Sequence, residues 1–268
     1  MGKAVFFDID GTLIDSGHGM PYMSQRTKQA IRDLQAAGHY TFIASGRPYA
    51  FLDKEILEFG FDGYILMNGA TVILNDKVIY KKALPDDFVQ DTCNLCEKNQ
   101  VEYILQGIHH VYLKNKFSGL DEFYTSFHIA KDRFIYDFDR SRTSAYKMEF
   151  LAQNENGKAL YHSLLNEDMT GIQDPAHNMN FELYARAETK ATGIRHALDY
   201  LSIPVEDSFA FGDGENDREM MCAVGCSFAR GNAQPSLKEL ASYTVDSVRN
   251  NGVAEGIGRY ILNQVHTK

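Results

Sequence analysis

The chain of 268 residues contains no tryptophan, only six prolines and only four cysteines. No stretch reaches the roughly 20 consecutive apolar residues of a membrane-spanning helix, so we expect no membrane partner. The two cysteine pairs, Cys93/Cys96 and Cys222/Cys226, lack the neighbouring histidines of a zinc site, and we expect inert thiols. No basic segment followed by an apolar run precedes the first predicted strand, so we expect no signal peptide and a reducing, cytoplasmic location.

Basic residues are fewer than acidic residues. The chain has 27 Lys and Arg against 36 Asp and Glu, a net charge of −9. A nucleic-acid partner is therefore not expected, because that surface requires a basic patch. A phosphorylated small molecule remains compatible with this balance, since a few cations in one cleft outweigh the overall charge locally. We expect a monomer or a weak homodimer.

The most informative stretch is the first predicted strand, residues 4–7 (Ala-Val-Phe-Phe), whose apolar run predicts burial on both faces. Asp8 and Asp10 follow it, and residues two apart on an extended chain point in the same direction. Two neighbouring carboxylates repel each other unless a cation lies between them. Mg²⁺ fits best, because it prefers oxygen ligands and often binds one or two carboxylates together with a phosphate. Gly11 then allows a sharp turn or a close approach to a ligand.

An Asp-x-Asp pair is not specific by itself. It also fits a solvated loop, and it occurs in glycosyltransferases that hold a metal and a nucleotide sugar. A calcium loop of the EF-hand kind is excluded, because Leu13 stands where that loop requires glycine. The metal hypothesis therefore depends on partners elsewhere in the chain.

The second such signature lies at Ser45-Gly46. Helical spacing of apolar residues over 25–37 followed by an apolar run at 40–44 predicts a βαβ unit with parallel strands. Pro48 suits the first turn of the next helix, predicted at 51–59. Ser45 and the amides around Gly46 would then lie at a strand's carboxyl end near a helix N-terminus, where anions bind.

The order of the predicted helices and strands indicates two domains. Residues 83–183 change from α/β alternation to the order αββαβαβ, which indicates a separate α+β domain. We therefore predict an α/β fold with a Rossmann-like parallel-sheet core formed by residues 1–82 and 184–268. An inserted α+β cap domain would comprise residues 83–183.

The third signature follows the buried strand predicted at 208–211. It reads Gly-Asp-Gly-Glu-Asn-Asp over residues 212–217 and contains Asp213, Asn216 and Asp217. In a parallel sheet the three strand ends lie on one edge, where open α/β folds bind ligands. Lys190, at the start of a predicted helix, adds positive charge. Acids for a metal, a hydroxyl and amides for phosphate, and a lysine for charge balance are suited to phosphoryl transfer.

These stretches resemble the four ordered motifs of the haloacid dehalogenase-like hydrolases. They are residues 8–12 (Asp-Ile-Asp-Gly-Thr), residues 45–47 (Ser-Gly-Arg), Lys190 and residues 212–217. The long insertion between the second and third motifs resembles that of the Cof-type phosphatases, which carry a large α/β cap there. One departure is Ala191, where the family usually has glycine after the lysine.

The resemblance implies a role for each motif residue. Asp8 would be the nucleophile that forms an aspartyl-phosphate, and Asp10 would protonate the leaving group and then activate water. Mg²⁺ would be held by the Asp8 carboxylate, the Asp10 backbone carbonyl and Asp213. Most of the remaining motif residues would contact phosphate oxygens: Ile9 through its amide, Ser45, Gly46, Lys190 and Asn216. Asp217 and Arg47 would support those contacts without touching the phosphate.

We therefore expect a phosphoric monoester hydrolase, a Mg²⁺-dependent phosphatase for small phosphorylated metabolites such as sugar phosphates. A phosphomutase would share the covalent intermediate but return the phosphoryl group to substrate. A phosphate- or sugar-sensing module with vestigial activity is the alternative from another class. The presence of Asp10 argues against a sensor, because only catalysis needs this residue.

Overall fold

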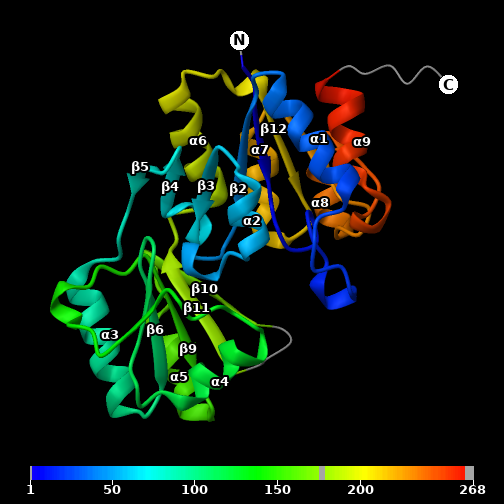
Figure 1. The fold of residues 1–268 in the computed structure, drawn as a ribbon. Helices are drawn as coiled ribbons and strands as arrows, with labels where there is room; N and C mark the ends of the chain where they lie inside the picture. The colour runs from blue at the N-terminus through cyan, green and yellow to red at the C-terminus, as the bar shows by residue number, and fades with distance from the viewer. Residues whose placement is uncertain (1, 175–178, 263–268) are drawn as a thin grey trace. The chain divides into compact units, whose positions relative to one another are not determined.

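The structure is a computed structural model that describes residues 2–174 and 179–262 (Figure 1). The chain divides into two compact units. The first comprises residues 1–46, 55–80 and 189–268, and the second comprises residues 47–54 and 81–188. The polypeptide therefore passes four times from one unit to the other.

The first unit is built on an eight-stranded sheet in the order β14-β13-β12-β1-β2-β3-β4-β5. From β14 to β3 the neighbouring strands are parallel, and β4 runs antiparallel to β3. The expected α/β class with a parallel-sheet core is thus confirmed. The strands are β1 (Ala4–Phe7), β2 (Tyr40–Ala44), β3 (Gly63–Leu66), β4 (Thr71–Leu74), β5 (Lys77–Lys81), β12 (Ser208–Gly212), β13 (Cys226–Ala229) and β14 (Tyr243–Thr244).

Helices cover the sheet because its central strand β1 is apolar throughout and every residue of β1 is buried. Alternate β1 residues, Ala4 and Phe6, pack with Ile194 of α6 and Met220 of α7, while α1 packs against α9 (Figure 1). The helices of this unit are α1 (Gln25–Ala36), α2 (Lys54–Phe59), α6 (Lys190–Leu201), α7 (Arg218–Ala223), α8 (Pro235–Leu240) and α9 (Gly252–Gly256), which continues as a π-helix over Ile257–Ile261.

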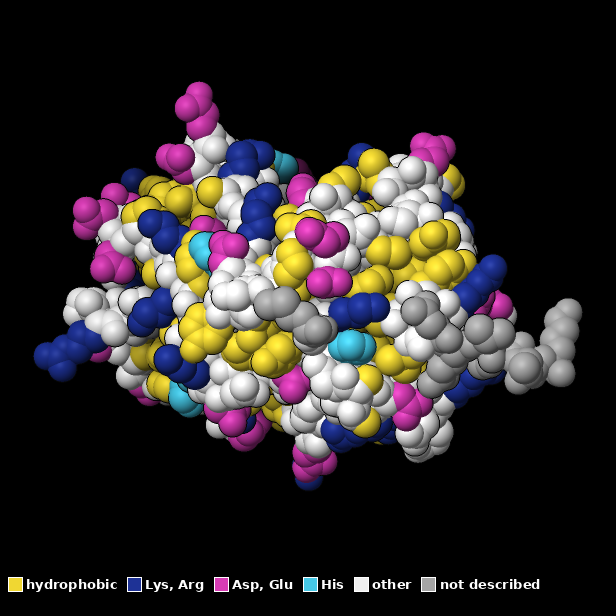
Figure 2. Space-filling view, turned by 90° about the horizontal axis from the view of Figure 1, so that it is seen from above, with side chains coloured by type: hydrophobic (Ala, Val, Ile, Leu, Met, Phe, Trp, Pro, Cys, Tyr) yellow, Lys and Arg dark blue, Asp and Glu magenta, His cyan; other side chains and the backbone are white. Residues whose placement is uncertain are grey.

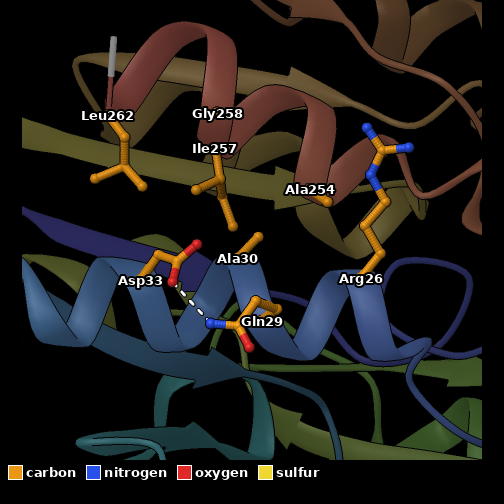
Figure 3. A pocket seen from close by; sticks show the side chains of 8 residues that line it. All are labelled: Arg26, Gln29, Ala30, Asp33, Ala254, Ile257, Gly258 and Leu262. Atoms are coloured by element: carbon orange, nitrogen blue, oxygen red, sulfur yellow. Dashed lines mark hydrogen bonds between the residues drawn. The ribbon is translucent and has the colours of Figure 1, made fainter. Parts of the chain in front are cut away.

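A pocket lies between α1 and the α9 segment (Figure 3). Gln29 and Asp33 of α1 form its polar side, where Gln29 Nε2 donates a hydrogen bond of 2.8 Å to Asp33 Oδ1. Ala254 and Ile257 lie opposite them. None of the predicted site residues lines this pocket.

The second unit contains a six-stranded sheet in the order β10-β11-β9-β6-β7-β8. All neighbouring pairs are antiparallel except β7 and β8, which are parallel. The strands are β6 (Glu102–Gln106), β7 (Val111–Leu113), β8 (Phe134–Tyr136), β9 (Lys147–Leu151), β10 (Met169–Gln173) and β11 (Asn180–Ala185), and the helices are α3 (Asp86–Lys98), α4 (Ser118–Ser126) and α5 (Glu155–Leu164).

Residues 47–54, a short segment in the N-terminal half of the chain, also belong to this second unit. The sequence predicted a continuous helix over 51–59, but the structure has a 3₁₀ turn, η2 (Tyr49–Phe51), then Leu52 in an extended conformation and then α2. The reason is apolar packing. Phe51 is buried, and its ring lies 4.8 Å from the ring of Tyr124 and 5.9 Å from that of Phe134, both in the second unit.

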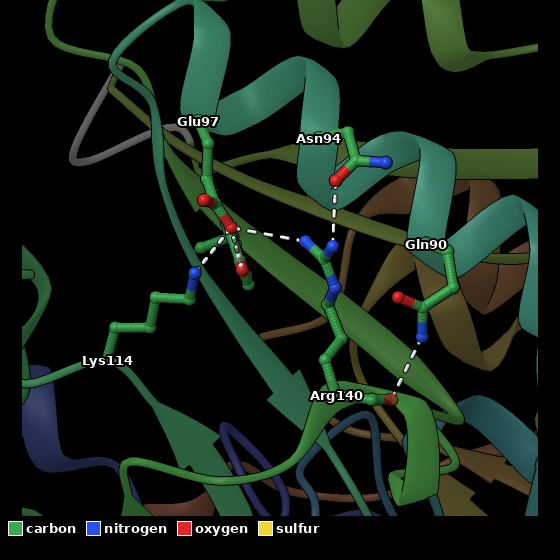
Figure 4. A network of polar contacts seen from close by, with 6 residues as sticks. Gln90, Asn94, Glu97, Lys114 and Arg140 are labelled. Atoms are coloured by element: carbon green, nitrogen blue, oxygen red, sulfur yellow. Dashed lines mark hydrogen bonds and ion pairs between the residues drawn. The ribbon is translucent and has the colours of Figure 1, made fainter.

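A polar network fastens α3 to the rest of the second unit (Figure 4). Glu97 Oε1 accepts hydrogen bonds from Tyr103 Oη at 2.8 Å, from Lys114 Nζ at 2.5 Å and from Arg140 Nη1 at 3.1 Å. Arg140 also donates to Asn94 Oδ1 at 2.7 Å. Burial raises the pKa of Glu97, but the hydrogen bonds from Lys114 and Tyr103 outweigh it, and the pKa lies below its ordinary value.

All four cysteines are free thiols, and they differ in exposure, since Cys222 is exposed. Cys93 and Cys96 are buried free thiols, and burial raises the pKa of both. On the face shown in Figure 2, lysine and arginine side chains lie interspersed among aspartate and glutamate side chains. Among the described helices, none is both long and apolar enough to cross a membrane.

Candidate active site

The three predicted strand-end signatures follow adjacent strands of the first unit. β1 lies between β12 and β2, with Phe7 in register with Phe211 on one side and Ile43 on the other. The Asp8 amide donates to the Phe211 carbonyl at 3.0 Å, so Asp8 leaves the sheet at the same level as the loop containing Asp213. The carboxyl ends of three parallel strands thus place Asp8, Ser45 and Asp213 on one edge of the sheet.

Lys190 lies fully buried between two carboxylates. Its Nζ is 2.6 Å from Asp8 Oδ1 and 2.6 Å from Asp217 Oδ1, and both are hydrogen bonds as well as ion pairs. Thr189 caps helix α6 and thereby fixes the position of Lys190 as the first helical residue. Gly69 permits close contact behind this cap, because a Cβ there would lie 2.0 Å from the Thr189 carbonyl oxygen.

Burial contributes strongly to the pKa values of Asp8 and Lys190. Desolvation raises the pKa of Asp8 well above its ordinary value, even though Lys190 opposes the shift, and the charges of Asp217 and Asp10 add to it. For Lys190, burial lowers the pKa, but the charges of Asp217 and Asp8 outweigh that effect and raise it above its ordinary value. Lys190 is therefore charged at neutral pH.

Asp213 forms hydrogen bonds with three other residues. Its Oδ1 accepts from Thr12 Oγ1 at 3.2 Å and its Oδ2 accepts from Asn232 Nδ2 at 3.1 Å, while its amide donates to Asp217 Oδ2 at 2.9 Å. Gly11 has φ +80°, and a Cβ there would lie 2.0 Å from Asp213 Oδ2. Burial raises the pKa of Asp213 to about 6, with a further contribution from the charge of Asp217.

The acids fit a hard divalent cation. Asp8, Asp213 and Asp217 each offer a carboxylate oxygen, and these oxygens lie within 4.8 Å of one another. Both oxygens of Asp217 already accept protein hydrogen bonds, from Lys190 and from the amides of Asp213 and Gly214. Asp217 has no exposed side-chain surface, whereas Asp8 and Asp213 retain some, so these two are the more accessible donors. Burial is the main cause of their raised pKa values, and a cation beside them would favour their ionised forms.

Other predicted site residues are brought to this edge with different exposure. Ser45 is buried, and its amide donates to the Ile65 carbonyl at 2.8 Å, with Gly46 next to it. Ile9 is buried, whereas Asp10 is exposed, and the charge of Asp10 acts on Asp8. Asn216 is exposed in the 3₁₀ turn η6 (Glu215–Asp217).

Arg47 lies in the second unit, although it directly follows Gly46 in the chain. Its Nη1 donates to the Phe51 carbonyl at 3.2 Å and pairs with Asp53 Oδ2 at 3.1 Å. Its expected support of the phosphate site remains a prediction.

Sequence reasoning assigned no role to three further polar residues of this edge. Thr12 and Asn232 hold Asp213, as described above. Asn68 is buried with φ +56°, its Oδ1 has no hydrogen-bond partner among the described residues, and it lies 2.9 Å from the position of a Cβ on Gly46. The signal for Asn68 was its place two residues after strand β3, a fourth strand end on the same edge.

Fold and site together are those of a hydrolase of phosphate esters. The sequence model of the haloacid dehalogenase-like hydrolases matches residues 5–257. The protein YkrA of Bacillus subtilis (strain 168) is 30% identical over 261 residues, which cover 95% of this chain and 96% of YkrA. The chain therefore belongs to the haloacid dehalogenase-like hydrolase family, and it is a phosphatase.

Two further relatives show the range within the family. The 5-amino-6-(5-phospho-D-ribitylamino)uracil phosphatase YitU of Bacillus subtilis (strain 168) is 25% identical, and the match covers 96% of each chain. The solved structure of the subclass IIB sugar phosphatase BT4131 superposes with a TM-score of 0.78 at 28% identity, covering 96% of this chain and 98% of BT4131.

Proposed function

We propose that this protein is a Mg²⁺-dependent phosphatase that hydrolyses small phosphorylated metabolites through an aspartyl-phosphate on Asp8. The observation that carries the proposal is the buried Lys190 ammonium, which bridges Asp8 and Asp217 at 2.6 Å each. This contact favours the ionised form of Asp8 against the opposing effect of burial, and it orients the carboxylate, as a nucleophile requires. Asp213 adds the second carboxylate that a divalent cation needs nearby.

The proposed reaction has two steps, and the first forms the aspartyl-phosphate. An Asp8 carboxylate oxygen attacks phosphorus, and the bond from phosphorus to the ester oxygen breaks. Asp10 donates its proton to that oxygen, so the leaving group departs as an alcohol. Lys190, with the Ser45 hydroxyl and the amides of Ile9 and Gly46, would stabilise the negative charge on the phosphoryl oxygens.

In the second half-reaction Asp10 removes a proton from water. The water oxygen attacks phosphorus, inorganic phosphate leaves, and the Asp8 carboxylate is restored. Mg²⁺, held by Asp8, Asp213 and the Asp10 carbonyl, would supply positive charge to the phosphoryl oxygens when bound. Exposure of Asp10 suits a group that must reach both the leaving-group oxygen and the attacking water.

The substrate class is proposed from the relatives. A sugar phosphatase and a phosphatase of a ribityl phosphate both act on phosphate esters of polyhydroxylated chains. We therefore place the substrates of this chain among sugar and polyol phosphates.

The test is phosphate release from a panel of sugar phosphates, polyol phosphates and nucleotides, with and without Mg²⁺. Asp8→Asn, which keeps the size of the side chain, is the matched variant. We expect turnover of sugar or polyol phosphates that requires Mg²⁺, and loss of all turnover in Asp8→Asn. Full activity after chelation would contradict the metal assignment, and an active Asp8→Asn variant would contradict the covalent route.

A further inference from the structure

Arg230 is a buried cation that the proposed reaction does not use. It follows strand β13, its side chain is only 1% exposed, and neither Nε nor Nη1 has a hydrogen-bond partner among the described residues. Burying a charge without hydrogen bonds is costly, so such a residue requires opposite charges around it. Burial lowers the pKa of Arg230 to about 10, so it is still charged at neutral pH.

Asp213, one of the proposed metal ligands, is a neighbour of Arg230. Gly212 is in register with Ala229, and the Arg230 amide donates to the Gly212 carbonyl at 3.0 Å. Arg230 and Asp213 are thus the next residues along two hydrogen-bonded strands. Two residues further on, Asn232 contacts Asp213 Oδ2 at 3.1 Å. The loop that contains Arg230 therefore forms one wall of the acidic site.

Two more acids act on Arg230, one from the segment after β14 and one from α9. Asp246 and Glu255 contribute negative charge, after Asp213. They are linked to each other, because the Asp246 amide donates to Glu255 Oε2 at 3.1 Å, and the Gly231 amide donates to the Asp246 carbonyl at 3.4 Å. Arg230 therefore lies between the metal-site acid and a second acidic pair.

We propose that Arg230 sets the strength of divalent-cation binding, because its positive charge beside Asp213 repels the incoming ion. This inference rests on the proposed function, since it assigns a role toward the metal of that site. Asp8, Asp10, Asp213 and Asp217 supply four negative charges, and Lys190 supplies one positive charge. Arg230 adds a second positive charge beside Asp213, and this charge weakens the attraction of the site for a divalent cation. Removing it strengthens the attraction, so the ion binds more tightly.

The experiment measures the dissociation constants of Mg²⁺ and Mn²⁺ by calorimetry on the full chain at pH 8. Arg230→Met removes the charge and keeps an unbranched apolar stem, and we expect both ions to bind tighter by on the order of tenfold. The shift has the same size for both ions, because it arises from charge and not from ligand geometry. Arg230→Lys keeps the charge and should stay within about twofold of the unmodified protein.

Two further variants separate this role from other effects. Arg195→Met removes one positive charge from an exposed position on α6 and should leave both constants within about twofold. Glu255→Gln weakens the compensation of Arg230, so both ions should bind several-fold more weakly. This variant also tests the inference if Arg230→Met fails to fold, which circular dichroism would show.

The outcomes are distinguishable. If the unmodified protein binds neither ion, the metal of the proposed function is wrong and the inference falls with it. If the unmodified protein binds both ions and hydrolyses phosphate esters, but neither Arg230→Met nor Glu255→Gln changes the constants, only the inference is overturned. Equal changes in Arg230→Met and Arg230→Lys would likewise overturn it, because they would indicate a packing effect.

Discussion

At the scale of single residues, Lys190 balances the two carboxylates between which it is buried. Removing one partner of a buried ionic group leaves the others uncompensated, which costs more than the pair contributes when intact. Without the ammonium, Asp8 and Asp217 would repel each other in a site with little solvent. One of them would then take up a proton at neutral pH.

We therefore expect Lys190→Met to lower turnover by at least ~10²-fold, since both the charge on the phosphoryl group and the ionised nucleophile are affected. The free energy of unfolding should fall by about 3–5 kcal/mol at pH 7. The loss should be smaller at pH 5, where the carboxylates are more readily protonated. Urea unfolding at the two pH values measures this difference.

The control is Lys28→Met, which breaks the partly exposed ion pair of Lys28 Nζ with Glu55 Oε1 at 2.7 Å. An exposed pair contributes at most about 1 kcal/mol, so this variant should lose little stability at either pH. An equal loss at pH 5 and pH 7 for Lys190→Met would argue that the lysine acts through packing alone.

Asp10 allows a separate prediction, because the two proton transfers assigned to it matter unequally. A sugar alkoxide must be protonated to leave, whereas nitrophenolate leaves without a proton. Asp10→Asn should therefore lose sugar-phosphate turnover by ~10²–10⁴-fold. With nitrophenyl phosphate its first step should survive better than its second, which still needs a base.

The phosphorylated Asp8 should then accumulate in Asp10→Asn, visible as a burst of nitrophenolate and as added phosphate mass on the Asp8 peptide. Mg²⁺ affinity is measured in parallel, because the amide could disturb the metal. Equal loss on both esters with no burst and normal metal binding would mean that Asp10 is not the acid–base residue.

At the scale of elements, the α3 network offers a test of what holds the second unit together. Three donors converge on a single oxygen of Glu97, which lies 30% exposed. The pKa of Glu97 is below its ordinary value, so its stabilising effect is present at pH values above the unfolded-state pKa. That effect is lost as the pH falls through the folded-state value.

Glu97→Ala should lower the free energy of unfolding by about 1–2 kcal/mol at pH 7 and by clearly less at pH 3. Urea unfolding followed by tyrosine fluorescence at both pH values provides the measurement. Glu155→Ala is the control, because Glu155 pairs with Lys158 at 2.9 Å and its side chain is 86% exposed. A loss as large for Glu155→Ala, or unchanged between the two pH values for Glu97→Ala, would contradict the network's role.

Elements with strong local signals were predictable from the sequence. Some patterns involve only residues that are close in sequence. Examples are the apolar run of β1 with the acids after it, and the helical spacing of α1. The Asn75-Asp76 turn between β4 and β5 was also predictable, and both residues have positive φ. Strand-end chemistry could be read in the same way, because parallel strands bring their carboxyl ends together.

Elements that depend on distant partners were missed. β8 has only three residues, and β10 includes Gly171, whose absent Cβ would lie 1.9 Å from the Glu182 carbonyl oxygen of β11. Neither strand has a local pattern that distinguishes it from a loop. The 3₁₀ turn around Phe51 was read as helix for the same reason. Its geometry is set by aromatic contacts with Tyr124 and Phe134, which are more than 70 residues away in sequence.

At the scale of the whole molecule, stability should depend jointly on pH and Mg²⁺. Asp213 has a folded-state pKa of about 6, raised above its ordinary value of 3.8, chiefly by burial. The folded state therefore binds a proton more tightly than the unfolded chain does. Without metal, the stability that this proton provides is fully present below about pH 4 and is lost as the pH rises through about 6.

A divalent cation replaces that proton, because it binds the ionised carboxylate. Mg²⁺ at 100 times its dissociation constant should add about 2.7 kcal/mol to the free energy of unfolding at pH 7.5. At pH 5.0 Asp213 is mostly protonated and the proton competes with the ion, so the same Mg²⁺ concentration should add much less. Thermal unfolding of the full chain with Mg²⁺ or with chelator at the two pH values measures both effects.

Asp213→Asn is the matched control, since the amide neither titrates nor provides an anionic ligand. This variant should show a small Mg²⁺ effect that is the same at pH 5.0 and pH 7.5. It should also be more stable than the unmodified protein at pH 7.5 in chelator, because a buried negative charge has been removed from beside Asp217. An equal Mg²⁺ effect at both pH values in the unmodified protein would show that the ion does not compete with a proton on Asp213. The ion would then have to be held by other ligands.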